Sequence, residues 1–224
     1  MIEINKLYDT VTKYLVLKGK GGYGTNAQFN DDVRRCQTML QNYYINRYAE
    51  SSIIEESLST FIQRQTIVLT SDIMPKPVTF RHKISAKYQY TINNADFSNS
   101  SLQEFPLIEL RANEWDATHN SVIRGANKEK ERGYYRIVGD EMQFSFNKGT
   151  VIMTFITKPP TAVRQVTLDV ATDNENFNGV GTINLAWNES DENNLIDIML
   201  WFKGIQIRES EIMNWVVSSK QLMK

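Results

Sequence analysis

The chain has 224 residues, of which 41% are hydrophobic and 23% charged, and this composition is typical of a globular protein with one large domain or two small ones. Its 25 basic and 26 acidic residues leave a net charge of -1, so the basic excess of nucleic-acid-binding proteins is absent. The single cysteine, Cys36, excludes an internal disulfide framework and favours a reducing compartment such as the cytoplasm.

The first 63 residues are predicted to form a small helical unit. Apolar residues at helical spacing predict an amphipathic helix over residues 3–17. The glycines of Gly19–Gly24 end that helix. Thr25 has a glutamine three residues later, a capping-box pattern that opens a second helix. Ser52 has a glutamate three residues later, so we expect a third, shorter helix there.

The next part of the chain alternates between apolar and polar residues, which predicts β-strands. The longest such run is Val78–Ile92, a strand that would extend roughly 50 Å and either bend in its middle or project as an arm. Shorter strands are predicted at Thr66–Thr70 and Leu107–Leu110, and a helical turn or two at 113–119. Residues 124–133 are highly charged and are predicted to be a solvated loop.

Residues 134–158 are predicted to form an antiparallel meander. Apolar residues alternate there in three runs, separated by Gly139-Asp140 and by Asn147-Lys148-Gly149. Both separators supply the positive-φ positions that tight hairpin turns need. The pattern ends at Lys158, because the two prolines that follow lack the N–H group of a ladder.

Two more strands are predicted beyond these prolines, at Val166–Val170 and Ile183–Trp187. A polar connection over Asp173–Gly181 is expected to join them, with a turn at Asn178-Gly179.

Helices are predicted at the end of the sequence. The first is expected to be capped by Ser190 or Asp191 and to end at Gly204, and the second to cover Glu209–Gln221. The run Ser190-Asp191-Glu192 is acidic enough to suggest a cation site. We interpret it as helix capping, because carboxylates favour the positive end of the helix dipole.

This order of elements predicts an α+β fold with N-terminal helices, an antiparallel β-rich middle of meander or sandwich type, and C-terminal helices. Three regions are expected. They are a helical N-terminal unit over residues 1–65, a β-rich domain over residues 66–187, and a C-terminal helical pair over residues 188–224 that packs with the N-terminal helices.

A glycine-rich stretch, Gly19–Gly24, matches the pattern G-x-G-x-x-G. A dinucleotide-binding loop follows a strand, whereas a helix is predicted before this one, and no Gly-Lys-Ser/Thr completes a Walker A loop. We interpret the stretch as a flexible connection between helices, or as a loop that adapts to a neighbouring subunit with Lys18 and Lys20 exposed.

The residues that could carry chemistry do not form a recognisable set. His82 lies on the apolar face of a predicted strand, where a packed or half-exposed side chain is expected. His119 lies near Glu114 and Asp116, but one histidine with local carboxylates falls short of a metal site. Cys36 is expected to be a buried thiol. We therefore expect no catalytic, metal or cofactor site, and predict that the protein is not an enzyme.

Two features of the sequence bear on contacts between copies of the chain. Trp187, Trp201 and Trp215 lie near the C-terminal helices, where core packing and an aromatic subunit interface are both open interpretations. Residues 1–50 carry 7 basic and 5 acidic side chains, and residues 161–224 carry 5 and 9. A slightly basic start and an acidic end favour head-to-tail packing.

Several stretches together resemble a structural protein of the virions of crAss-like phages and related short-tailed phages of Bacteroidetes hosts. They are the opening helix Leu7–Leu15 with the glycine-rich loop and Phe29-Asn30, then Glu114-Trp115-Asp116 with Asn120–Ile123, then Tyr135–Ile137 through Met142 to Phe155–Pro160, and last Asn194–Ile196 through Lys203–Ile205 to Trp215.

The resemblance implies a ring of twelve copies in the neck or tail, which connects the portal to the tail of a podovirus and lets DNA pass through its lumen. Its partners would be other copies of the chain, the portal protein and neighbouring ring proteins, with DNA only as passing cargo and no membrane. The protein would assemble in the host cytoplasm and be found in the virion. No leader precedes the first helix, and no run approaches the ~18 apolar residues of a membrane-spanning helix.

In such a ring, the glycine-rich loop or the Val78–Ile92 strand is expected to contact a neighbour. The candidate interface residues are Lys18, Lys20, Tyr23, Tyr88, Tyr90 and Trp215. The alternative is a monomeric β-rich adaptor that binds a peptide or a glycan without catalysis. Such an adaptor would expose an aromatic groove and remain a single copy.

Overall fold

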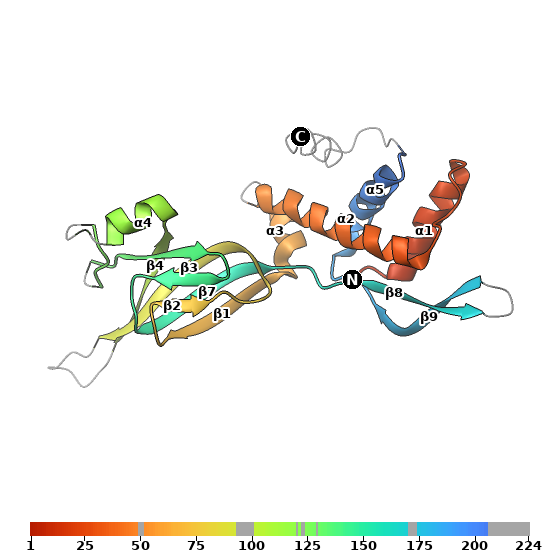
Figure 1. Cartoon of the computed structure of the whole chain (residues 1–224). Helices are drawn as coiled ribbons and strands as arrows, with labels where there is room; N and C mark the ends of the chain where they lie inside the picture. Colours follow the sequence, from red (N-terminus) through yellow and green to blue (C-terminus); the bar gives the residue numbers. More distant parts are fainter. Residues whose placement is uncertain are drawn as a thin grey trace. The chain divides into compact units, whose positions relative to one another are not determined.

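The computed structural model describes residues 1–48, 52–92, 101–119, 121, 124–128, 130–169 and 174–205, and it confirms the α+β class. The helices of this part are α1 (Ile4–Leu17), α2 (Asn26–Asn46), α3 (Ser52–Ser59), α4 (Ala112–His119) and α5 (Glu192–Phe202), with a 3₁₀ turn, η1, at Glu189–Asp191 (Figure 1). The strands are β1 (Ile62–Leu69), β2 (Ile73–Pro75), β3 (Phe80–Ile92), β4 (Ser101–Glu109), β5 (Gly133–Val138), β6 (Glu141–Phe144), β7 (Gly149–Thr157), β8 (Val163–Asp169) and β9 (Asn174–Ile183). None of the helices in the described ranges is long and apolar enough to cross a membrane.

The chain divides into two compact units. The β unit is Ile62–Lys158, and the helical unit combines Met1–Phe61 with Pro159–Lys224. The predicted regions place the boundaries differently, because the ribbon β8–β9 groups with the helices. The carbonyl of Arg164 on β8 of this ribbon accepts hydrogen bonds from the side chains of Asn26 and Asn30 on α2, at 2.7 and 3.1 Å.

Helix α5 packs with the N-terminal helices, as the sequence suggests. The thiol of Cys36 on α2 donates a hydrogen bond to the carbonyl of Leu195 on α5, with a distance of 3.3 Å between Sγ and O. The ammonium group of Lys203, at the end of α5, lies 2.8 Å from a carboxylate oxygen of Asp32. The predicted helix over Glu209–Gln221 lies outside the described residues.

Both N-terminal helices begin and end near the predicted residues. Helix α1 buries Ile4, Leu7, Val11 and Leu15 of the apolar stripe that predicted it, while Tyr14 is exposed. Helix α2 begins after Thr25, whose hydroxyl accepts a hydrogen bond from the backbone N–H of Gln28 at 3.2 Å. This bond satisfies one of the N–H groups that the first turn of a helix leaves free. The predicted third helix ends at Ser59, and Phe61 is buried outside it against Trp187.

Replacing Thr25 with alanine is expected to lower the free energy of unfolding of the helical unit by about 0.5–2 kcal/mol, because the cap hydrogen bond is lost. Thr25→Ser keeps the hydroxyl and should remain close to the wild type. Denaturant titrations followed by circular dichroism at 222 nm compare the three proteins. An equal loss in both variants would show that the methyl group, and not the hydroxyl, matters.

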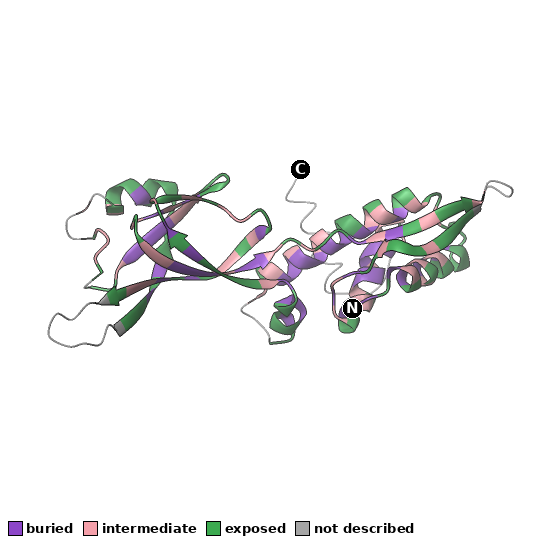
Figure 2. Ribbon diagram, turned by 90° about the horizontal axis from the view of Figure 1, so that it is seen from below, coloured by how far each residue is buried: buried purple, intermediate pink, exposed green. Residues whose placement is uncertain are grey.

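The β unit is a single curled sheet with the strand order β1-β7-β3-β4-β5-β6-β2. Strands β1 and β2 form opposite edges of the sheet, yet only residues 70–72 link them. That link spans at most about 14 Å. The outer strands of a flat seven-stranded sheet would lie about 29 Å apart. The sheet therefore curls around one core, and Figure 2 shows buried residues along its inner side.

The predicted meander is right for its first hairpin and wrong for its third strand. Strands β5 and β6 pair antiparallel around Gly139-Asp140, and Gly139 has a φ of 59°. Strand β7 instead pairs with β1 and β3, while the other side of β6 is taken by β2. Most of β7 is buried, and it lies inside the sheet next to the edge strand β1, with a partner on each side.

The long strand starts later than predicted and is irregular. Val78 is exposed in a turn, and β3 begins at Phe80. Its pairing with β7 shifts register between Phe80 and His82, and again between Lys83 and Ser85. A shift of one residue changes the face on which a side chain lies. His82 is consequently exposed, while Lys83 forms a 2.7 Å ion pair with Glu109.

The predicted polar connection over Asp173–Gly181 is wrong, because most of it is strand β9. The ribbon β8–β9 is bent where Asn178 accepts a hydrogen bond from the N–H of Val180 at 3.0 Å. The predicted strand Ile183–Trp187 is also wrong beyond Ile183. Leu185 forms an isolated bridge with Ile2, and Trp187 is fully buried in the helical core.

Candidate functional site

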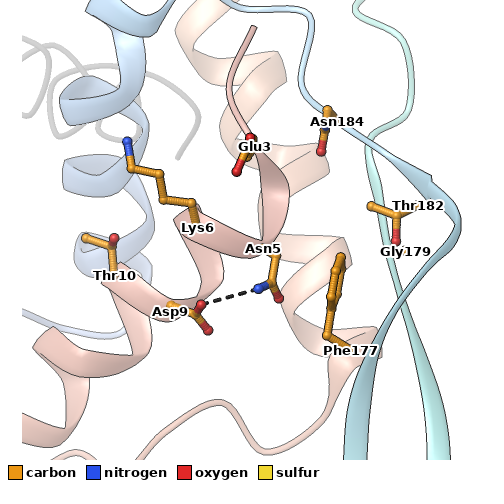
Figure 3. A pocket seen from close by; sticks show the side chains of 9 residues that line it. All are labelled: Glu3, Asn5, Lys6, Asp9, Thr10, Phe177, Gly179, Thr182 and Asn184. Atoms are coloured by element: carbon orange, nitrogen blue, oxygen red, sulfur yellow. Dashed lines mark hydrogen bonds between the residues drawn. The ribbon is translucent and has the colours of Figure 1, made fainter.

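A polar pocket in the helical unit is the candidate site (Figure 3). It lies where the first half of α1 faces β9 and the residues that follow β9, and its volume is about 540 Å³. Its lining residues are Glu3, Asn5, Lys6, Asp9 and Thr10 from the start of the chain, and Phe177, Gly179, Thr182 and Asn184 from the later segment.

Hydrogen bonds hold the two walls of the pocket together. Asn184 accepts a hydrogen bond from the backbone N–H of Ile4 at 3.2 Å, which fixes the later segment to the first turn of α1. Asn5 and Asp9 are four residues apart and therefore lie on one face of the helix, where the Asn5 amide donates to the Asp9 carboxylate at 3.3 Å. The first bond joins the two walls, and the second orients two side chains of one wall.

The pocket carries two carboxylates that no described cation neutralises. The ammonium of Lys6 lies 3.1 Å from Glu192 on α5, and Figure 3 shows its side chain extending away from Phe177. Glu3 and Asp9 form no ion pair with a described residue. The Phe177 side chain beside them is 45% exposed. Carboxylates beside an exposed aromatic ring suit a cationic group.

The guanidinium of Arg164 supports this pocket from the protein side. Its Nε donates to Asn5 at 3.0 Å and its Nη1 to Asn26 at 3.1 Å. The same group lies 3.8 Å from the centre of the Tyr8 ring and 5.6 Å from that of Phe177. Arg164 is 5% exposed and forms no ion pair within the described part of the chain. It is a positioning residue for Asn5 and Phe177.

A second polar cluster is closed to solvent. Asp191 is 2% exposed and makes no side-chain cap for α5, so the predicted capping role is wrong for this residue. One of its carboxylate oxygens accepts hydrogen bonds from the hydroxyls of Tyr44 at 2.6 Å and Ser57 at 3.1 Å. Burial raises the pKa of Asp191, and these hydrogen bonds offset part of the increase. The cluster joins α2, α3 and α5 and is structural.

Three of the predicted interface residues lie in the connection between α1 and α2. Lys18 and Lys20 are exposed, as predicted. Tyr23 is half-buried against Phe29, with 5.1 Å between ring centres, and the Lys203 ammonium lies 4.3 Å from the centre of its ring. Burial raises the pKa of Tyr23, whose hydroxyl has no hydrogen-bond partner among the described residues. Tyr23 therefore packs mainly within its own chain.

The other predicted interface residues belong to strand β3 or lie outside the structure. Tyr88 is fully buried and its hydroxyl donates a hydrogen bond to the carbonyl of Lys148, so this side chain is not available to a neighbour. Tyr90 is half-buried, and its hydroxyl lies within hydrogen-bond distance of the side-chain oxygen of Gln103, at 3.0 Å, and of the carbonyl of Lys128, at 3.2 Å. Trp215 lies outside the described residues.

The histidines and the cysteine do not come together. His82 is exposed, and burial of part of its ring lowers its pKa. His119 stacks on Trp115 with 5.1 Å between the ring centres. Cys36 is buried, as predicted, and burial raises the pKa of its thiol. Among the residues that the structure describes, no group of three or more His, Cys, Asp and Glu side chains is placed to hold a metal ion.

Sequence reasoning did not find the pocket. Phe177 stands in a segment rich in asparagine, which resembles a loop, and its role depends on β9 lying against α1. Glu3 and Asp9 are ordinary polar positions of an amphipathic helix. Residues 3–10 and 177–184 are far apart in the sequence, and no local pattern indicates that they meet.

The comparison with known protein families finds no matching family model, and no curated protein is significantly similar to the chain.

Proposed function

We propose that the chain is a structural subunit of a phage virion, which forms a multi-copy ring in the neck or tail, connects the portal to the tail and lets DNA pass. The sequence resemblance suggests this role, and unpaired strand edges in both units support it. A protein that acts by self-association needs surfaces that pair with further copies, and free strand edges are such surfaces.

The observation that carries the proposal is the ribbon β8–β9. Among the described residues each of its two strands pairs only with the other, so both long edges of the ribbon lack a strand partner. Val180 on β9 is 82% exposed. The ribbon packs against α2, and its open edges leave room for a strand of another chain to pair with it.

A second free edge lies in the β unit. Strand β1 pairs with β7 on one side and has no strand partner on the other within the described residues. Four consecutive residues, Gln63 to Thr66, are exposed, and so is Val68. This edge is polar enough to stay soluble and long enough to pair with a strand of a neighbour.

Mass photometry with negative-stain imaging of the purified chain tests the proposal. We expect closed rings of about a dozen copies, since head-to-tail interfaces that close by rotation leave no free edge. Addition of the portal protein should promote the rings if the free chain alone assembles weakly. Mass spectrometry of purified virions should find the polypeptide in the particle.

A chain that stays a single copy with and without the portal protein would overturn the ring. The adaptor alternative would then be favoured, with the pocket of Figure 3 as its binding site. Virions that lack the polypeptide would remove the structural role altogether.

A further inference from the structure

The two ends of α1 carry opposite charge and are both open to solvent. The pocket beside its first half is lined by the carboxylates of Glu3 and Asp9 and by Lys6, whose ammonium pairs with Glu192. Lys18 and Lys20 follow its last turn, are exposed, and form no ion pair with a described residue. The 14 residues of α1, a rise of about 21 Å, lie between Glu3 and Lys18, and Asp9 is nearer to Lys18, with a rise of about 13 Å between them.

Each end also exposes apolar side chains next to its charges. Phe177 lines the pocket, and Val180 and Ile183 are exposed beside the lining residues of β9. At the other end of the helix, Leu17 is 70% exposed and Val16 is also exposed. An apolar centre with a charged rim is typical of protein interfaces.

The helix dipole alone does not explain this arrangement. Glu3 and Lys18 are the N-cap and C-cap residues of α1, where the dipole favours their charges, but Asp9 lies in the middle of the helix. Helix-dipole effects fall off within the first and last turns. They also give no reason for the exposed Phe177 and Leu17.

We propose that the pocket of Figure 3 receives the loop between α1 and α2 of a second copy. The ammonium groups of Lys18 and Lys20 in that loop lie against Glu3, Asp9 and the Phe177 ring. This inference rests on the proposed ring and names one of its contacts. The contact joins two different patches, so it is heterologous, which is the geometry that closes a ring. The second copy is favoured as the occupant because the same chain carries the complementary charges and exposed apolar residues.

A charge swap in the full-length chain tests the contact. The first variant, called the socket variant, changes the pocket and carries Glu3→Lys and Asp9→Lys. The second, called the loop variant, changes the loop and carries Lys18→Glu and Lys20→Glu. Each variant alone should self-associate at least about tenfold more weakly than the wild type, because like charges then face each other. An equimolar mixture should recover assemblies in which the two variants alternate. A single chain that carries all four substitutions should also assemble with itself, because opposite charges face each other again.

Matched controls change the same number of charges in the β unit at exposed positions. Asp72→Lys with Glu141→Lys matches the socket variant, and Lys148→Glu with Lys158→Glu matches the loop variant. These controls should assemble like the wild type. Native mass spectrometry, with one variant labelled by a heavy isotope, counts the copies of each chain in every assembly.

The outcomes separate this inference from the proposed ring. Rings that form equally well from the wild type and from each single variant would overturn the contact and leave the ring standing. Loss of rings in the single variants without recovery in the mixture or in the fourfold variant would also overturn it. A wild-type chain that remains a single copy at the highest attainable concentration, with or without the portal protein, would overturn both.

Discussion

Replacing Arg164 with methionine is expected to lower the free energy of unfolding of the helical unit by about 3 kcal/mol. The Arg164 guanidinium donates hydrogen bonds to Asn5 and Asn26 and stacks on Tyr8. Methionine fills much of the same space but leaves both amide oxygens without that donor. Denaturant titration followed by circular dichroism at 222 nm measures the loss, because the longest helices belong to this unit.

Two further variants show that the effect comes from the buried guanidinium. Arg164→Lys keeps the charge but not the planar fork of donors, so it should recover only part of the stability. Arg34→Met removes an exposed arginine of α2 that pairs with Asp31, and it should change the free energy of unfolding by no more than about 0.5 kcal/mol. Equal effects of Arg164→Met and Arg34→Met would contradict the role of Arg164.

The stability of the helical unit should fall as the pH rises from about 4 through the raised native pKa of Asp191, and Asp191→Asn should reduce this dependence. Burial raises the pKa of Asp191 in the folded chain above its unfolded value. Over this interval the folded state therefore holds a proton that the unfolded state has released. Each step up in pH favours unfolding until the folded carboxyl is also ionised.

The hydrogen bonds of Asp191 determine which substitutions are tolerated. One carboxylate oxygen accepts from both Tyr44 and Ser57, whereas the other is buried without a hydrogen-bond partner in the described part of the chain. Asparagine keeps the oxygen that accepts both bonds and loses the charge, so at pH 7.5 it should be at least as stable as the wild type. Asp191→Ala leaves both hydroxyls without this acceptor and should cost about 2 kcal/mol.

Unfolding titrations of wild type, Asp191→Asn and Asp191→Ala at a series of pH values check this account. Burial also raises the pKa of Asp197, so a weaker slope of the same sign should remain in Asp191→Asn. An unchanged slope in Asp191→Asn would show that Asp191 is not the group that titrates.

Features that depend on neighbouring residues in the chain could be predicted from the sequence. Helix α2 begins after Thr25 because its capping hydrogen bond spans three residues. The hairpin β5–β6 forms at Gly139-Asp140 because Gly139 adopts a positive φ without a steric cost. The α+β class follows from the order of such segments.

Features that depend on distant partners could not be predicted. Strand β7 lies between β1 and β3, which take up the backbone hydrogen bonds of its two edges, and its apolar pattern does not identify these partners. The asparagine-rich sequence of β9 predicts a loop, yet this segment forms a strand because it pairs with β8. Asp191 stands where a helix cap is expected, but its carboxylate is buried and accepts hydrogen bonds from the hydroxyls of Tyr44 and Ser57.

The sequence by itself determined the approximate positions of α1, α2 and α5, the turn at Gly139-Asp140, the class of the fold and the exposure of Lys18 and Lys20. Only the tertiary structure brought Phe177 to the same pocket as Glu3 and Asp9 and placed Arg164 against Asn5 and Phe177. Capping and periodicity act over a few residues, whereas a pocket forms between segments whose approach is decided by the burial of the whole unit.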